Sequence, residues 1–249
     1  MSLQNPRTFL DIAQRACVEC GVASNQAIAS ALPTIAGASG STGRVIGWIN
    51  DGWTDIQMDH EDWDWMRSSN ILGQGVSFQT INGQASYPLG TGPGTVGVDP
   101  ELFGKWDRET IWSYTTANGF NDEINLGEVT FDQWRSVYMS NANRNVRSRP
   151  QAFAVGPDQS LCLGPNVNGN YTVTADYFVA PSVMVNDSDV PVGLPSRFTM
   201  LIIYRTMQKY GRYESAPEVY ERGTEENNGM FAQLLSVRAP RIGFSGALA

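Results

Sequence analysis

Residues 42–67 read TGRVIGWINDGWTDIQMDHEDWDWMR, and this stretch decides the fold of the helical part of the chain. Its apolar side chains recur at helical spacing, with acidic side chains largely on the opposite side. The apolar stripe consists of Val45, Trp48, Ile49, Trp53, Ile56, Trp63 and Met66. Four of the seven tryptophans fall here, which is more aromatic surface than an exposed helix tolerates. We therefore predict one long helix that packs against other helices or another subunit.

A second helix is predicted upstream of this stretch. Asn5 is a good N-cap and Pro6 suits the first helical position, and apolar residues then recur at helical spacing up to Cys20. Residues 22–43 are rich in Ala, Ser, Gly and Thr, which is typical of a loop or a short irregular helix.

Helical spacing returns near the C-terminal end. Apolar residues repeat at this spacing over 198–210. Ser215, with Glu218 three residues later, predicts a capping box for a final helix that ends at about Val237. The remaining residues contain Pro and Gly and predict an extended C-terminal arm.

Between the helical ends, β-branched and aromatic residues alternate with Gly, Pro and Asn, which is typical of strands. Asn82-Gly83 predicts a two-residue hairpin turn, because both turn residues need positive φ. The four glycines of Gly90–Gly97 indicate a mobile hairpin tip or loop, and 131–138 predicts a short helix. The predicted strands are 76–81, 85–89, 110–115, 153–155, 161–163 and 171–179.

These patterns predict an α+β fold: a helical bundle made by the N- and C-terminal helices, an inserted antiparallel β domain and an extended C-terminal arm. The predicted parts are residues 1–70 (N-terminal helices), 71–190 (β region), 191–237 (C-terminal helices completing the bundle) and 238–249 (arm).

Composition excludes several classes of function. The formal net charge of −8 repels phosphates, so the sequence predicts no grip on nucleic acid by charge. Met1–Pro6 resembles no secretory signal and the apolar run 200–204 is too short to span a bilayer, so we expect an intracellular chain without membrane contact. The odd number of cysteines, three, predicts free thiols.

The candidate catalytic and metal-binding residues are few. His60 is the single histidine and lies among acidic residues on the predicted helix, which favours a solvated side chain over a catalytic one. Cys17 and Cys20 form a Cys-x-x-Cys pair in the last turn of a helix, where no dipole lowers a thiol pKa, and the only other thiol is Cys162. We therefore predict no metal, no cofactor and packed, unreactive cysteines.

Two polar clusters leave alternatives open. Asp59, Glu61, Asp62 and Asp64 could supply paired carboxylates for glycoside hydrolysis, but nothing in the pattern isolates one of them in an apolar site. The sequence contains no phosphate loop, dinucleotide fingerprint or nucleophile elbow, so we predict no enzyme activity. The basic cluster, Arg144, Arg147 and Arg149 with nearby Arg135, could touch nucleic acid, but in an acidic chain it favours salt bridges to a neighbouring subunit.

The segment 43–57, GRVIGWINDGWTDIQ, followed by Trp63-Asp64-Trp65-Met66-Arg67, resembles the N-terminal helix of the head-to-tail adaptor (connector) proteins of tailed bacteriophages. Further similarity lies in 149–155, in Asp176-Tyr177-Phe178, and in 194–218, where Leu194-Pro195 precedes a helix. The similarity covers most of the chain and its motifs are structural.

This resemblance implies a structural virion protein, made in the host cytoplasm and placed at the head-tail interface. It implies a homo-oligomeric ring, dodecameric in this family, that binds the portal protein, extends the DNA channel toward downstream tail or nozzle proteins, and lets DNA pass without specific binding. A tail-tube or tail-completion protein remains an alternative, as does, more remotely, a tail-associated cell-wall hydrolase.

The C-terminal arm carries the predicted partner-binding residues. Arg238, Arg241, Ile242 and Phe244 combine charge with apolar anchors, as interface hot spots do. We expect this arm to dock onto the portal or onto an adjacent adaptor subunit. A disordered, solubilising tail is the alternative.

Overall fold

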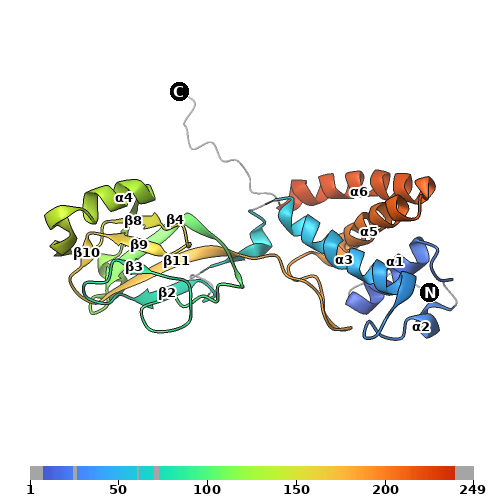
Figure 1. Cartoon of the computed structure of the whole chain (residues 1–249), viewed down its shortest axis with the longest axis horizontal. Helices are drawn as coiled ribbons and strands as arrows, with labels where there is room; N and C mark the ends of the chain where they lie inside the picture. Colours follow the sequence, from blue (N-terminus) through green and yellow to red (C-terminus); the bar gives the residue numbers. More distant parts are fainter. Residues whose placement is uncertain (1–7, 25–26, 61, 70–72, 239–249) are drawn as a thin grey trace, which may run out of the picture. The chain divides into compact units, whose positions relative to one another are not determined.

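The computed structural model describes residues 8–24, 27–60, 62–69 and 73–238. The chain forms two compact units, one of Met1–Trp65 with Pro181–Ala249 and one of Met66–Ala180. The first unit holds all the described α-helices except α4 (Phe131–Tyr138), and the second holds α4 and the sheets (Figure 1). The predicted α+β fold, with helical ends and an inserted β region, is therefore confirmed.

The unit boundaries lie at 65/66 and 180/181, whereas the sequence predicted 70/71 and 190/191. Residues 66–69 belong with the β unit, because β1 (Arg67–Ser68) pairs with the end of the long strand β11 (Tyr171–Val179). Residues 181–190 belong with the helical unit. They are held there by two amide side chains of helix α3 (Gly40–Met58). The Gln57 amide donates to the Ser182 carbonyl at 2.9 Å and accepts from the Ser182 N–H at 2.9 Å. The Asn50 amide likewise donates to the Met184 carbonyl at 2.9 Å and accepts from its N–H at 3.0 Å.

Helix α1 (Phe9–Glu19) begins after a capping box in which Thr8 Oγ1 accepts from the Asp11 N–H and Asp11 Oδ2 accepts from the Thr8 N–H. Its next free N–H groups donate to the returning segment, Phe9 to the Asp189 carbonyl at 2.7 Å and Leu10 to that of Asp187 at 3.1 Å. The described helix thus starts later than predicted, and Asn5 and Pro6 lie outside the described residues. Residues 22–43 were expected to form a loop or a short irregular helix, and they contain the four-residue helix α2 (Ile28–Ala31).

Helix α3 (Gly40–Met58) is shorter than the long helix predicted over 42–67. In a longer helix the Ile56 carbonyl would accept from the N–H of residue 60. It accepts instead from the indole N–H of Trp63 at 2.9 Å, which caps the end of the helix. Trp48 and Trp53 lie on α3, whereas Trp63 lies beyond it and stacks on Trp65 of the 3₁₀ turn Asp64–Met66, with ring centroids 4.3 Å apart. Trp63 is nonetheless fully buried, as the apolar stripe required.

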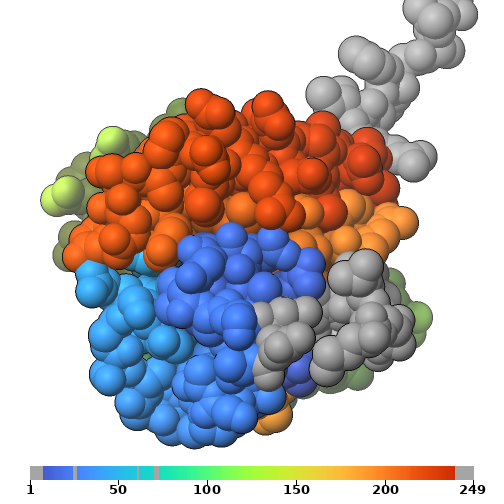
Figure 2. Space-filling model, turned by 90° about the vertical axis from the view of Figure 1, so that its right-hand side faces the viewer, coloured from blue at the N-terminus to red at the C-terminus, as the bar shows by residue number. Residues whose placement is uncertain are grey.

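Helices α5 (Met200–Tyr213) and α6 (Pro217–Arg238) complete this unit, after a 3₁₀ turn at Ser196–Phe198. Figure 2 shows α6 lying across the top of the unit, above α1. Two glycines permit close helix packing: a Cβ on Gly52 of α3 would lie 3.3 Å from the Ile202 carbonyl oxygen, and one on Gly223 of α6 would lie 3.0 Å from that of Tyr204. The predicted capping box at Ser215 is wrong, because Ser215 has a φ of 53° and the helix begins at Pro217 after Ala216.

The β unit contains three sheets and one helix within its described residues. The five-stranded sheet has the order β1-β11-β4-β5, with β2 also paired to β11. A four-stranded sheet has the order β3-β9-β8-β6, and β10 pairs with β7. The bounds are β2 Val76–Gln79, β3 Ser86–Tyr87, β4 Phe103–Thr115, β5 Ile124–Asn125, β6 Gly127–Glu128, α4 Phe131–Tyr138, β7 Arg147–Ser148, β8 Ala152–Val155, β9 Leu161–Gly164 and β10 Asn166–Val167, with 3₁₀ turns at Gly119–Asp122 and Asn141–Asn145.

Two sequence predictions for this unit need correction, and the predicted antiparallel pairing is confirmed for most of the strands. The turn at Asn82-Gly83 forms, with Gly83 at a φ of 84°, but it joins no hairpin, since β2 pairs with β11 and β3 with β9. The sheets are largely antiparallel, yet the short β6–β8 and β10–β7 pairs are parallel. Strand β4 also starts at Phe103 rather than near Thr110, because the charged residues before Thr110 hid its alternation.

The core of the β unit draws on both larger sheets. Its buried side chains include Phe78, Trp106, Phe153, Leu161 and Val173. Helix α4 covers β8 and β9, where the Trp134 indole N–H donates to the Leu163 carbonyl at 2.9 Å. A hydrogen bond from the Gly90 N–H to the Val98 carbonyl, 2.7 Å, closes the loop that contains Gly90–Gly97. Within this loop the Val96 side chain is fully buried.

Candidate interaction surfaces

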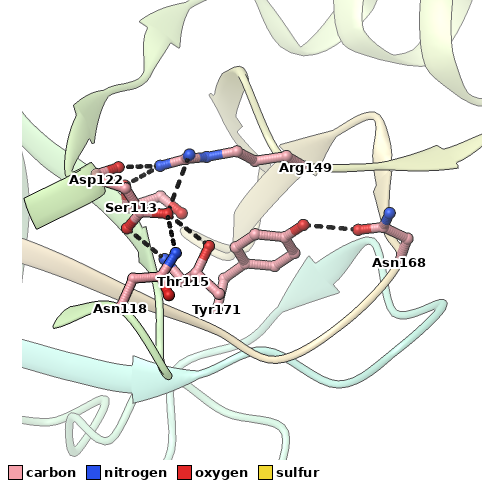
Figure 3. Close-up of polar contacts among 7 residues, drawn as sticks. All are labelled: Ser113, Thr115, Asn118, Asp122, Arg149, Asn168 and Tyr171. Atoms are coloured by element: carbon pink, nitrogen blue, oxygen red, sulfur yellow. Dashed lines mark hydrogen bonds and ion pairs between the residues drawn. The ribbon is translucent and has the colours of Figure 1, made fainter.

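Arg149, predicted to contact a neighbouring subunit, is bonded within the β unit (Figure 3). Its guanidinium donates to the Ser113 carbonyl at 3.3 Å, to the Asp122 carbonyl, and to the Asp122 carboxylate at 3.3 Å. Asp122 is held in turn by the Thr115 hydroxyl and N–H, at 2.7 and 3.0 Å, and by the Asn118 amide at 3.3 Å. The arginine therefore ties β4 to the turn that follows it.

The same contacts shift the pKa of Asp122. Hydrogen bonds from Thr115 are the largest cause of its lowered pKa, and the Arg149 guanidinium adds to the shift. Sequence reasoning missed Asp122, because its arginine lies far away along the chain and no spacing rule connects the two. A local pattern could have indicated it: two hydrogen-bond donors, Thr115 and Asn118, precede Asp122 by seven and four residues, as in a turn after a strand.

Arg144 and Arg147 differ from Arg149 in being exposed. Arg144 donates to the Met139 carbonyl at the end of α4, at 3.1 and 3.3 Å, and Arg147 donates to Asn82 Oδ1 at 3.1 Å. Both guanidinium groups keep donors facing solvent. Their role in a subunit contact stays a prediction.

Arg238 is the last residue of α6, and it forms an ion pair with Asp64 at 2.8 Å. The pair attaches the end of α6 to the 3₁₀ turn after α3. The other predicted partner-binding residues, Arg241, Ile242 and Phe244, lie outside the described residues. The predicted arm is thus preceded by a helix end that the rest of the helical unit holds in place.

The cysteine pair lies where the sequence placed it, with Cys17 in the last turns of α1 and Cys20 at its C-cap. Burial raises the pKa of Cys17 to about 11, and burial together with the nearby Cys17 and Glu19 raises the pKa of Cys20 to about 12. Burial also raises the pKa of Cys162. At neutral pH all three thiols are protonated and poorly nucleophilic.

Of the predicted acidic cluster, Asp59 forms a structural contact, and Glu61 lies outside the described residues. Asp59 forms an ion pair with Arg205 of α5 at 2.5 Å, and His60 packs on Trp63 with ring centroids 5.3 Å apart. Within residues 8–24, 27–60, 62–69 and 73–238, no three His, Cys, Asp or Glu side chains gather closely enough to hold a metal ion. In the same parts of the chain no helix is sufficiently long and apolar to cross a membrane.

The described polar clusters hold elements of this α+β fold together. A model of the SU10 adaptor protein family matches residues 7–247, which is nearly the whole chain. The chain belongs to this family, and it is accordingly a phage adaptor-type structural protein. No curated protein matches the sequence.

Proposed function

We propose that this adaptor forms a homo-oligomeric ring at the head-tail interface of the virion, binds the portal protein and extends the DNA channel toward the tail. The family match over residues 7–247 is the observation that carries this proposal. The ring has about twelve copies, the number implied by the resemblance of residues 43–67 and 194–218 to head-to-tail adaptors.

The charge of the chain supports a conduit. A ring of about twelve copies with a net charge of −8 each would carry on the order of −100 formal charges. Such a surface repels the DNA backbone, so DNA passes without adhering. Exposed Arg144 and Arg147 supply local positive charge for contacts with acidic neighbours.

The C-terminal arm supplies the attachment to the portal or to an adjacent copy. It follows an α6 end that the Arg238–Asp64 ion pair holds, so the arm starts from a fixed point. Residues 239–249 combine one arginine with Ile242, Phe244 and Leu248, and they contain too much Gly and Pro to fold alone.

The test is truncation after Arg238, which removes the arm but keeps α6 and its ion pair. Purified full-length and truncated proteins would be mixed with portal rings and followed by electron microscopy and co-sedimentation. We expect the full-length chain to form rings on the portal and the truncated chain to remain folded but unassembled. Undiminished joining of the truncated chain would refute the role of the arm, and failure of the full-length chain to form any ring would refute the adaptor function itself.

The Arg238→Ala variant separates anchoring from docking. It leaves residues 239–249 in place and removes only the tether to Asp64, so portal binding should weaken rather than vanish. Arg222→Ala is its matched control, because Arg222 is an exposed arginine on α6 that forms an ion pair with Glu19 at 3.0 Å, away from the arm.

A further inference from the structure

A groove of about 500 Å³ lies in the β unit between the end of β2 and the glycine loop 90–97. This volume falls within the range of pockets that bind ligands. One wall is formed by Phe78, Gln79 and Ile81, and the other by Gly92, Pro93 and Gly94. All of these residues belong to one unit, so the groove exists within each copy of the chain.

The β2 wall offers an open strand edge. Among the described strands, β2 pairs with β11 alone. The Thr80 N–H donates to the Tyr171 carbonyl at 2.8 Å, and the antiparallel register pairs Phe78 with Val173. Because the direction of main-chain groups alternates along a strand, the N–H and C=O of Gln79 point away from β11, on the side of the groove. Such an edge is a template for one more strand.

The opposite wall is mostly bare main chain in a fixed loop. The Gln84 side chain donates to the Gly94 carbonyl at 2.8 Å, and Thr95 Oγ1 donates to the Gly90 carbonyl at 2.7 Å. A Cβ at Gly92 would meet nothing within 4 Å, so space is open beside it. A loop held in this way is preformed for binding, which lowers the entropic cost of taking up a ligand.

The chemistry of the lining selects an extended peptide that presents apolar side chains to the groove. Phe78, Ile81 and Pro93 supply apolar surface, and Ile81 is 46% exposed. Asn82 and Asn170 supply neutral amides that can pair with main-chain groups, and among the described residues no Asp, Glu, Lys or Arg lines the groove. Addition of a strand to a sheet edge combines these features: main-chain hydrogen bonds give affinity and apolar pockets accept alternate side chains.

The chain itself carries a segment with this pattern. Residues 239–249 read APRIGFSGALA, with Ile242, Phe244 and Leu248 at even positions and polar or small residues at odd positions from Arg241 onward. In an extended strand, alternate residues share a face, so these three side chains would lie on one face. Fully extended, this segment spans roughly 36 Å, which is long enough to reach a neighbouring molecule.

We propose that the free edge of β2 binds the C-terminal segment of a second copy of the chain as an added strand, with Ile242 and Phe244 against Phe78, Ile81 and Pro93. Gln79 exchanges main-chain hydrogen bonds with the incoming segment. This inference rests on the proposed ring, in which each copy has a neighbour. It identifies the groove as the site on the adaptor that receives the arm.

Disulfide trapping between full-length copies tests the contact. One copy carries Gly92→Cys and the other, distinguished by a mass tag, carries Ser245→Cys. The native cysteines are all buried, so mild oxidation should link only the introduced thiols. We expect a covalent heterodimer, and we expect Phe244→Ala in the tagged copy, which cannot disturb the fold of the groove, to lower its yield at least tenfold.

Gln79→Pro in the Gly92→Cys copy removes the N–H that faces the groove, at an edge position where proline is tolerated. Gln79→Ala is the matched control, because it removes the side chain and keeps the N–H. The yield should fall at least fivefold with Gln79→Pro and stay within twofold with Gln79→Ala.

Absence of the heterodimer from rings that form normally would overturn the groove assignment and leave the proposed ring intact. A disulfide from Gly92→Cys to a portal cysteine, in place of the tagged copy, would also overturn it. A yield unchanged by both Phe244→Ala and Gln79→Pro would show that the thiols meet by chance collision and would overturn it equally. Absence of rings by electron microscopy would instead count against the proposed function.

Discussion

The two units of this protein reach a buried core by different routes. The helical unit is assembled from both ends of the chain, and the β unit from one continuous stretch, Met66–Ala180. In the helical unit the return segment is clamped by Asn50 and Gln57, whose partners lie more than a hundred residues away in the sequence. In the β unit the Arg149–Asp122 contact joins residues 27 apart in the sequence, and β1 and β2 pair with β11 from the opposite end of the same stretch. Both units therefore close by the meeting of distant segments. Those of the helical unit come from the two ends of the chain, whereas those of the β unit belong to one continuous stretch.

This comparison predicts that damage to one core leaves the other unit folded. Trp53 and Phe153 are both almost fully buried, one in each unit. Replacing either by Ala should cost about 3–5 kcal/mol of unfolding free energy, through lost burial and the cavity left behind. Hydrogen exchange measured by mass spectrometry should show faster exchange in the helical segments for Trp53→Ala and in the β segments for Phe153→Ala. Equal loss of protection in both units for either variant would show that the units unfold as one.

Close helix packing in the helical unit gives the next largest effect. A Cβ at Gly52 would lie 3.0 Å from the Arg205 Cβ and 3.3 Å from the Ile202 carbonyl oxygen, so Gly52→Ala should destabilise this unit by about 1–3 kcal/mol. A Cβ at Gly47, on the same helix, would meet nothing within 4 Å, and Gly47→Ala should stabilise the helix by about 0.5–1 kcal/mol. Denaturant titration measures both, and a stabilising Gly52→Ala would disprove the close contact.

Local patterns in the sequence predicted single elements well. Helix α4 and strand β11 have the bounds predicted for them, 131–138 and 171–179. Thr130 and Gln133 form a capping box at the start of α4, and Gly169 and Pro181 flank β11. Helix α3 was predicted too long, since Trp63 and Met66 continue its apolar stripe although the chain leaves the helix at Met58. Periodicity reports which side chains are buried, and it does not report whether the same helix buries them.

Pairing between strands was less predictable than the strands themselves. The turn at Asn82-Gly83 was foreseen from φ preferences, but β2 and β3 join different sheets, because their partners β11 and β9 arrive from much later in the chain. The groove beside β2 depends on this choice of partners. For the same reason the sequence predicted a binding role for the arm but no surface to receive it.

The smallest expected effect is a difference in how the two units respond to acid. Asp189 in the helical unit has a lowered pKa because the N–H groups of Asn186 and Val185 donate to its carboxylate, and Asp122 in the β unit has a lowered pKa chiefly through Thr115. A carboxyl whose pKa is lower in the folded than in the unfolded state stabilises the fold above its unfolded pKa, about 4, and this contribution is lost as pH falls through the folded value.

At pH 7 both carboxylates therefore contribute fully, and acidification below about pH 4 should weaken each unit through its own aspartate. Asp189→Asn should reduce the acid sensitivity of the helical unit alone, and Asp122→Asn should reduce that of the β unit alone. The β unit keeps part of its sensitivity, because hydrogen bonds from Ser160 also lower the pKa of Asp158. Thermal unfolding from pH 7 to pH 3, followed by hydrogen exchange in each unit, measures this difference. If Asp122→Asn flattened the pH dependence of the helical unit as well, the two units would share one unfolding equilibrium, and their separate routes to a core would not confer separate stabilities.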